Sequence, residues 1–318
     1  MKWIKRGLLF NPEDHQLPEA CTSFAQSPQA LIFDDFVRIY FSTRRLQYSG
    51  QYLSYISFVD VDRSLQRILR TATTSVIPLG GLGCFDEHGI FPINVVRSGT
   101  DIYAFLSGWS RRISVPVETA IGLAISRDEG FTFERLGPGP IMASTPAEPF
   151  LVGDPFVLIR DGRWHMWYIM GTSWTPVGPS EGPARVYKIA HANSSDGRSW
   201  ERNAAPIITN ALGPDECQAL PTVFQQDGIW HMYFCFRQAT NFRTDRDRSY
   251  RLGYAFSHDM VEWQRDDANG GIDVSASGWD SDMLCYPHAF RCDGETYLLY
   301  NGNEFGRAGF GVAVLERP

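Results

Sequence analysis

Residues 152–168 read Val-Gly-Asp-Pro-Phe-Val-Leu-Ile-Arg-Asp-Gly-Arg-Trp-His-Met-Trp-Tyr and are the clearest copy of a pattern that recurs along the 318-residue chain. In each copy a proline opens a short apolar run, a polar turn follows, and an aromatic-rich run returns. This order of residues predicts a β-hairpin. The opening prolines stand 63 to 66 residues apart, at Pro28, Pro92, Pro155, Pro221 and Pro287.

A second strand pair follows the hairpins. Its copies run from Ile121 to Arg135, from Ile189 to Arg202 and from Leu252 to Arg265, and each ends in an aromatic residue, a polar residue and arginine. Four strands in a unit of about 65 residues, repeated along the chain, are typical of a β-propeller. The sequence therefore predicts an all-β fold, a five-bladed β-propeller with four-stranded antiparallel blades.

The last repeat lacks an outer strand of its own. Lys2-Trp3-Ile-Lys5 near the start of the chain is similar to the outer-strand segments Trp200-Glu-Arg and Trp263-Gln-Arg. We expect this N-terminal strand to pair with the outer edge of the last blade, because the pairing would leave no free sheet edge there. Residues 1–318 are then one domain, although the length alone would suggest two.

Composition narrows the classes of partner. A net charge of −7 argues against nucleic acid, since a phosphate-binding face needs a surplus of basic residues. No apolar stretch is long enough to span a membrane, and charges interrupt the first twelve residues as they would not in a signal peptide. The six cysteines form no CxxC motif, which favours reduced thiols and a cytoplasmic location.

A metal site is not expected. Cys84, Cys217, Cys285 and His88 all precede predicted inner strands, but their spacing matches no closed zinc pattern. The sequence gives no sign of another cofactor.

Polar residues are expected to gather at one end of the propeller axis. The first strand of each blade lines the axis and the second returns, so residues beside each proline and those about sixteen positions later should meet. Carboxylates from four repeats, two arginines and two tryptophans occupy these positions. The residues that this rule selects are Gln26, Asp86, His88, Asp154, Glu216, Asp280, Asp282, Tyr286 and His288 beside the prolines, and Arg44, Trp109, Trp174, Arg237, Asn301 and Asn303 after them.

This set of residues suits a sugar. Tryptophan and tyrosine offer flat faces to its C–H surface, while carboxylates, asparagines and arginines bind its hydroxyl groups. Two carboxylates in one funnel also meet the chemical requirement of glycoside cleavage. For any single acid the alternative is a structural role, because aspartate before a strand often caps a turn. Arg44 and Arg237 would suit phosphate, which leaves phosphorolysis as an alternative to hydrolysis.

Short motifs resemble known glycosidases. Gly153-Asp154-Pro155 resembles the Asp-Pro of the third acidic position in glycoside hydrolase family 43 and the Arg-Asp-Pro of family 32. Glu216-Cys217 resembles the Glu-Cys that carries the general acid of family 32. The segments 250–253 and 297–303 resemble late-blade segments of family 130, whose members include phosphorylases. As a repeat, the whole chain resembles the five-bladed propeller glycosidases of families 43, 32, 68 and 130, and bacterial proteins loosely described as glycosylases.

The resemblance implies roles for three acids. Glu216 would be the general acid and Asp154 would orient it or tune its pKa. The first-blade aspartate of these families would fall at Ser27, which cannot act as a base, so Asp86 is the base candidate. The expected partner is a small molecule or an oligosaccharide. A sugar-binding propeller without catalysis and an interaction scaffold that uses the rim loops remain alternatives, and the sequence leaves the sugar, the linkage and the oligomeric state open.

Overall fold

The computed structural model describes residues 1–177 and 182–316. These residues form antiparallel sheets with few helices, so the prediction of an all-β fold is confirmed. Within them no helix is long and apolar enough to cross a membrane. The helices are η1 (Pro12–Asp14), η2 (Pro18–Ala20), η3 (Arg246–Arg248), η4 (Asp267–Asn269) and α1 (Asn303–Gly306).

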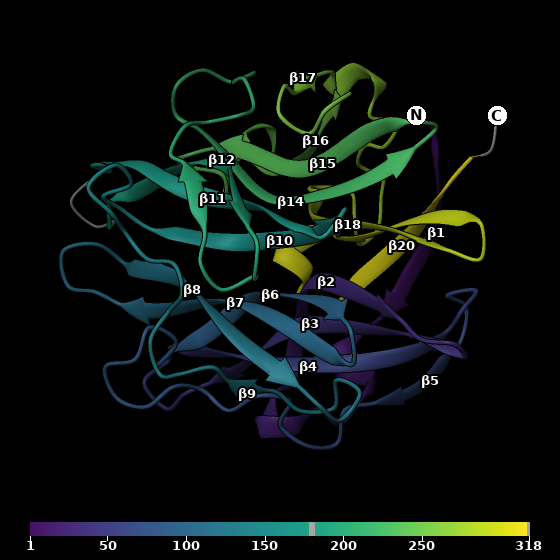
Figure 1. The fold of residues 1–318 in the computed structure, drawn as a ribbon. Helices are drawn as coiled ribbons and strands as arrows, with labels where there is room; N and C mark the ends of the chain where they lie inside the picture. The colour runs from purple at the N-terminus through teal and green to yellow at the C-terminus, as the bar shows by residue number, and fades with distance from the viewer. Residues whose placement is uncertain (178–181, 317–318) are drawn as a thin grey trace.

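Three of the sheets contain four strands each, and in two of them the strands follow one another in chain order. Figure 1 shows these three sheets in the upper half of the molecule. The strands are β10 (Val152–Arg160), β11 (Arg163–Thr175), β12 (Ala184–Ser194) and β13 (Glu201–Asn203); β14 (Glu216–Gln226), β15 (Ile229–Gln238), β16 (Arg251–Ser257) and β17 (Gln264–Arg265); and β18 (Cys285–Cys292), β19 (Glu295–Asn301), β20 (Phe310–Leu315) and β1 (Trp3–Phe10).

The remaining strands form one larger sheet in the lower half of Figure 1. It consists of two four-strand groups that are joined between β4 and β6 by one parallel pairing, Ser54 with Gly89. The hairpins that the proline pattern predicted are present in both groups. The strands are β2 (Ser23–Ile32), β3 (Phe36–Leu46), β4 (Tyr52–Asp62), β5 (Ile68–Thr71), β6 (Gly89–Ser98), β7 (Asp101–Arg111), β8 (Val117–Ser126) and β9 (Glu134–Arg135).

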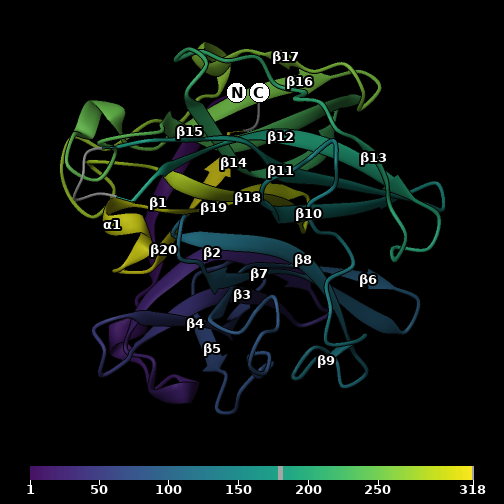
Figure 2. The same cartoon turned by 90° about the vertical axis from the view of Figure 1, so that its left-hand side faces the viewer.

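The N-terminal strand completes the last sheet. β1 runs antiparallel to β20, with Trp3 opposite Leu315, and both views of the ribbon show the two strands side by side (Figures 1 and 2). Trp3 is buried, and its Nε1 donates a hydrogen bond of 2.8 Å to the hydroxyl of Tyr233 in the neighbouring sheet. The two ends of the chain are therefore tied into one sheet and packed against the next.

Apolar clusters join each strand group to its neighbour. Aromatic and branched side chains that alternate along the strands point to both faces of the sheets, so every group has a face to bury on either side. The last of these clusters connects the final sheet to the first group. Pairs drawn from the successive clusters are Tyr40 and Ile90, Phe105 and Met166, Trp167 and Phe234, Tyr233 and Leu298, and Phe41 and Phe310.

A local irregularity marks each opening proline. The strand register shifts at these positions, and the residue before the proline has positive φ in Ser27 (53°), Asp154 (50°), Leu220 (49°) and Tyr286 (57°). Positive φ is uncommon for residues with a Cβ and costs about 1–3 kcal/mol. A bulge of this kind re-aims a side chain out of the regular strand alternation. In the second group the Phe91–Pro92 peptide is cis.

Candidate active site

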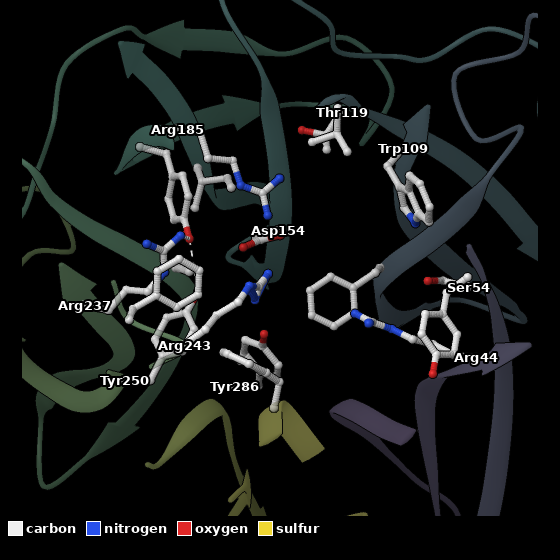
Figure 3. Close-up of a pocket in the computed structure, with 18 of the residues that line it drawn as sticks. Arg44, Ser54, Trp109, Thr119, Asp154, Arg185, Arg237, Arg243, Tyr250 and Tyr286 are labelled. Carbon is white, nitrogen blue, oxygen red and sulfur yellow. Dashed lines mark hydrogen bonds between the residues drawn. The ribbon is translucent and has the colours of Figure 1, made fainter. Parts of the chain in front are cut away.

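A cavity of about 370 Å³ collects side chains from all the strand groups (Figure 3). Five of the residues selected from the sequence line it: Arg44, Trp109, Asp154, Arg237 and Tyr286. Asp154 and Tyr286 owe their positions to the bulges before Pro155 and Pro287. The structure therefore brings five of the selected residues together at one cavity.

Asp154 is the acid of this cavity. Its backbone N–H donates a hydrogen bond of 3.2 Å to the hydroxyl of Ser107, which fixes the start of β10 against β7. Burial raises the pKa of the Asp154 carboxyl to about 7, while the Arg185 charge and the backbone N–H of Leu220 oppose the rise. In Figure 3 Arg185 and Arg243 reach toward Asp154 from opposite sides. A carboxyl with this pKa is protonated in about half of the molecules at neutral pH.

Aromatic residues and hydroxyl groups form the walls. Tyr286 packs edge to face against Phe91 and Tyr250, with ring centroids 5.2 and 5.7 Å apart. The hydroxyl groups of Tyr187 and Tyr250 lie 3.0 Å apart, and Arg237 donates a hydrogen bond of 2.9 Å to Tyr187. Flat apolar faces beside fixed polar groups provide the surface that a sugar ring requires.

The cavity is strongly cationic although the protein carries a net charge of −7. Five arginines line it, and Asp154 is the one acidic residue of the lining within the described part of the chain. With Asp154 ionised, the lining carries a net charge of +4, because five positive charges face one negative charge. The five are Arg44, Arg111, Arg185, Arg237 and Arg243.

Three other acids expected at the axis, Asp86, Glu216 and Asp280, belong to a second set of contacts, which we name the framework pairs. In each pair a carboxylate before or at the start of an inner strand binds a cation on the outer strand of the same group. The carboxylates are buried, with side-chain exposures of 0 to 5%. The pairs are Asp86 with Arg135, Glu148 with Arg202, Glu216 with Arg265, and Asp280 with Lys5.

Both carboxylate oxygens of Glu216 accept hydrogen bonds from neighbouring residues. Its Oε1 accepts hydrogen bonds from Arg265 at 2.6 Å and Gln218 at 2.8 Å, and its Oε2 accepts two from the backbone N–H groups of Ala211 and Leu212, both at 2.7 Å. The structure thus corrects the expectation that four acids gather in one funnel. Asp86, Glu216 and Asp280 bind outer-strand cations, and of the four, Asp154 alone is in the cavity lining.

Four further polar residues from the sequence rule hold loops in place. Asn301 accepts from the backbone N–H of Ser27 and donates to two carbonyl oxygens, and Asn303 accepts from the backbone N–H of Asp282. Gln26 is buried and donates to the Phe305 carbonyl at 2.5 Å. The Asp282 side chain is exposed, 3.7 Å from Arg246. None of Gln26, Asp282, Asn301 and Asn303 is among the described residues of the cavity lining.

Trp174 and His88 lie beside the cavity, whereas His288 lies in a different one. Trp174 lines an adjoining cavity of about 520 Å³ that shares Arg185, Arg237 and Arg243 with the first. His88 stacks on Trp109 with ring centroids 5.9 Å apart. His288 lines a different cavity of about 360 Å³, where burial lowers its pKa to about 3.

The sequence rule missed the residues that enter at the start of the third strand in the first four groups. The third strand begins where the second ends, so its first residues face the same cavity. A rule that included these positions would have selected Ser54, Thr119, Arg185, Tyr187 and Tyr250. It would still have missed Phe242 and Arg243, which follow β15 in the charged segment 240–250.

Within the described residues, no group of three or more His, Cys, Asp or Glu side chains is placed to hold a metal ion. The polar groups of the cavity are mainly arginines, tyrosines and one aspartate, and arginine carries no lone pair for a metal. The arrangement instead suits a ligand that offers hydroxyl groups or negative charge.

Comparison with solved structures identifies the fold. The chain superposes on a protein titled glycoside hydrolase with a TM-score of 0.74 at 14% identity, covering 99% of this chain and 92% of that one. A thermostable family-43 glycoside hydrolase gives a TM-score of 0.65 at 14% identity, covering 93% and 91%. An endo-arabinase from Bacteroides thetaiotaomicron gives 0.63 at 12% identity, covering 98% and 99%. At these identities the likeness establishes the fold, that of propeller-type glycoside hydrolases.

Two relatives are similar over the entire length. They are the uncharacterized proteins MT1551 and Rv1502 of two Mycobacterium tuberculosis strains, CDC 1551 / Oshkosh and ATCC 25618 / H37Rv. Each is 34% identical over 317 residues, which covers 99% of this chain and 100% of the relative. No protein-family model matches the chain. An identity of 34% over full length shows common descent, and the chain belongs to the family that contains MT1551 and Rv1502.

Proposed function

We propose that residues 1–318 form one five-bladed β-propeller. Two observations support this architecture. The four-strand groups follow the proline repeat, with β1 supplying the outer strand of the last group. The apolar clusters also connect each group to the next and the last to the first, as a ring requires.

We further propose that the protein is a carbohydrate-active enzyme that cleaves a glycosidic bond in the cavity around Asp154. The observation that carries this proposal is a buried carboxyl with a pKa near 7 among the aromatic walls of a cavity. A general acid works best when its pKa lies near the working pH. The structural neighbours described as glycoside hydrolases and as an endo-arabinase support the same class of reaction.

The proposed step begins with Asp154 protonated. The carboxyl donates its proton to the bridging oxygen as the bond from that oxygen to the anomeric carbon breaks. In hydrolysis a water molecule supplies the oxygen that bonds to the anomeric carbon, and the proton that this water loses returns the Asp154 carboxylate to its protonated form. Trp109 and Tyr286 would hold the sugar ring against the acid. Asp154 thus takes the proton-donor role that the resemblance gave to Glu216.

Glu216 and Asp86 have no part in this proposal. The oxygens of Glu216 accept four hydrogen bonds from framework groups, and Asp86 binds Arg135. Releasing either carboxylate for chemistry would break a buried ion pair, which costs about 3–5 kcal/mol.

A second candidate function is saccharide binding without cleavage. Glycoside hydrolases use two carboxylates about 5 to 10 Å apart, whereas the described lining of the cavity contains one. The phosphorylase alternative placed phosphate between Arg44 and Arg237. These arginines lie on opposite sides of Asp154 in Figure 3, so a phosphate bound by both would have to span the cavity.

The test is a screen of aryl glycosides and oligosaccharides with the wild type and Asp154→Asn. We expect sugar release by the wild type and a loss of about 100-fold or more in the variant, because asparagine cannot donate the proton. The matched control is Asp161→Asn in an exposed turn, which should release sugar at the wild-type rate. Equal rates for wild type and Asp154→Asn would refute the proton-donor role. Tight saccharide binding without release by the wild type would establish the binding function.

A further inference from the structure

The cavity arginines differ from the other cations near the axis in forming no ion pair among the described residues, although they share the cavity with Asp154. Arg135, Arg202 and Arg265 each bind a buried carboxylate. By contrast, none of the five cavity arginines forms an ion pair within 4.0 Å with a carboxylate of the described residues. A cationic cavity of this kind favours an anionic ligand, because burying positive charge without a partner is unfavourable.

Unused hydrogen-bond donors add to this argument. Arg185 and Arg243 donate no hydrogen bond to any group that the structure describes, and they contact aromatic rings at 5.6 and 4.7 Å. The Nε atoms of Arg44 and Arg237 are buried without an acceptor among the described residues. Burial lowers the pKa of Arg44, and the nearby Arg243 charge acts in the same direction. Several donors are therefore in place for an acceptor that would come with the ligand.

Two of the cavity arginines lie next to Asp154, the proposed proton donor. Arg185 is the second residue of β12 and Arg243 follows β15, and Figure 3 shows both directed toward Asp154. Arg185 and Arg243 also line the adjoining cavity that contains Trp174. An anionic group bound there would lie at the junction of the two cavities, with room for sugar rings on either side.

We propose that the ligand of this cavity presents an oxyanion to Arg185 and Arg243. The oxyanion is either an acidic group on the saccharide, such as a carboxylate or a phosphate ester, or inorganic phosphate bound beside a neutral saccharide. Guanidinium groups match the planar, two-oxygen geometry of such anions better than other cations do. This inference rests on the proposed function, because it names the substrate class of the same site.

The experiment measures dissociation constants by calorimetry at pH 7 and low salt. The probes are matched pairs of an acidic and a neutral sugar, namely glucuronic acid with glucose and glucose 6-phosphate with glucose, and inorganic phosphate with and without a neutral disaccharide. The proteins are the wild type, Arg185→Gln, Arg243→Gln and Arg127→Gln. Arg127 is exposed in a turn outside the cavity and is the matched control. Thermal unfolding checks that each variant is folded.

We expect the wild type to bind one source of the oxyanion at least about 10-fold more tightly than the neutral probe, which is the contribution of a charge-assisted hydrogen bond. Arg185→Gln and Arg243→Gln should each reduce that preference by about 10-fold, and Arg127→Gln should keep it. A preference for the acidic sugar places the anion on the saccharide. Phosphate that binds alone and strengthens binding of the neutral disaccharide identifies free phosphate as the source.

Three results would overturn the inference in different ways. Equal binding of acidic and neutral sugars, with no binding of phosphate, would exclude the anion site and leave the proposed function intact. Binding of phosphate without binding of any saccharide would refute the proposed function, and the inference with it. An anion preference that persists in both cavity variants would show that other groups bind the anion, which also contradicts the assignment to Arg185 and Arg243.

Discussion

The framework pairs and the cavity use the same kind of side chain in opposite ways. Arg265 in the framework reaches Glu216 at 2.6 Å and is almost fully buried. Arg185 in the cavity, one sheet away, has no carboxylate within ion-pair distance among the described residues. The difference teaches that a buried arginine with an acid serves the fold, whereas an arginine without one is available to a ligand.

The largest expected effect follows from a substitution that breaks a framework pair. Arg265→Met removes the cation and leaves the buried Glu216 carboxylate without its charge partner. We expect the free energy of unfolding to fall by about 3–5 kcal/mol. Urea unfolding followed by tryptophan fluorescence measures this change.

The control for that measurement is the exposed pair of Arg163 and Glu201, 3.6 Å apart. Arg163→Met should cost less than about 1 kcal/mol, because exposed pairs contribute little. A similar cost for both variants would mean that the framework pairs do not stabilise the fold.

An intermediate effect concerns Asp154 and pH. Its raised pKa means that the contribution of this group to stability is complete below the unfolded value of 3.8 and is lost as the pH rises through about 7. Asparagine cannot ionise, so the variant does not lose this stability. As the pH rises from 5 to 8, the free energy of unfolding of Asp154→Asn should increase by about 2–3 kcal/mol relative to that of the wild type.

The measurement is urea unfolding of both proteins at the two pH values. Asp161→Asn, whose side chain is exposed, should show no such trend. A stability difference between wild type and Asp154→Asn that does not change with pH would show that the Asp154 pKa is not raised.

The smallest expected effect concerns Arg185, an arginine of the cavity. Arg185→Met repeats the substitution made at Arg265, but here no ion pair of the described residues is broken, and at pH 5 the Asp154 carboxyl is protonated and does not depend on the Arg185 charge. We expect the free energy of unfolding to change by less than about 0.5 kcal/mol, as for substitutions that disturb no framework contact. The same unfolding assay checks it. A loss as large as that of Arg265→Met would assign Arg185 to the framework.

The all-β fold could be predicted from the sequence because its signals are local. Each hairpin contains its proline, its polar turn and its returning aromatic-rich strand within about twenty residues. The residues of the turn set how the two strands pair. The repeat at Pro28, Pro92, Pro155, Pro221 and Pro287 then supplied the number of units in the propeller that we propose.

The site could be predicted only in part. Asp154 and Tyr286 directly precede their prolines, and the bulges there turn both side chains into the cavity. Asp86 and Glu216 stand six and five residues before theirs, in segments that precede the axis-lining positions. Their cationic partners lie 49 residues further along the chain. At such a separation the sequence does not indicate which acid and which cation will pair.

The pairing of β1 with β20 has a consequence for biosynthesis. Residues 3–10 are synthesised well before their strand partner at 310–315, with all the other strands in between. Until then the buried rings of Trp3 and Phe10 have nothing to cover them on that side. The nascent chain must therefore keep an unpaired apolar strand soluble until residues 310–315 emerge, and loss of either β1 or β20 should produce the same aggregation-prone intermediate.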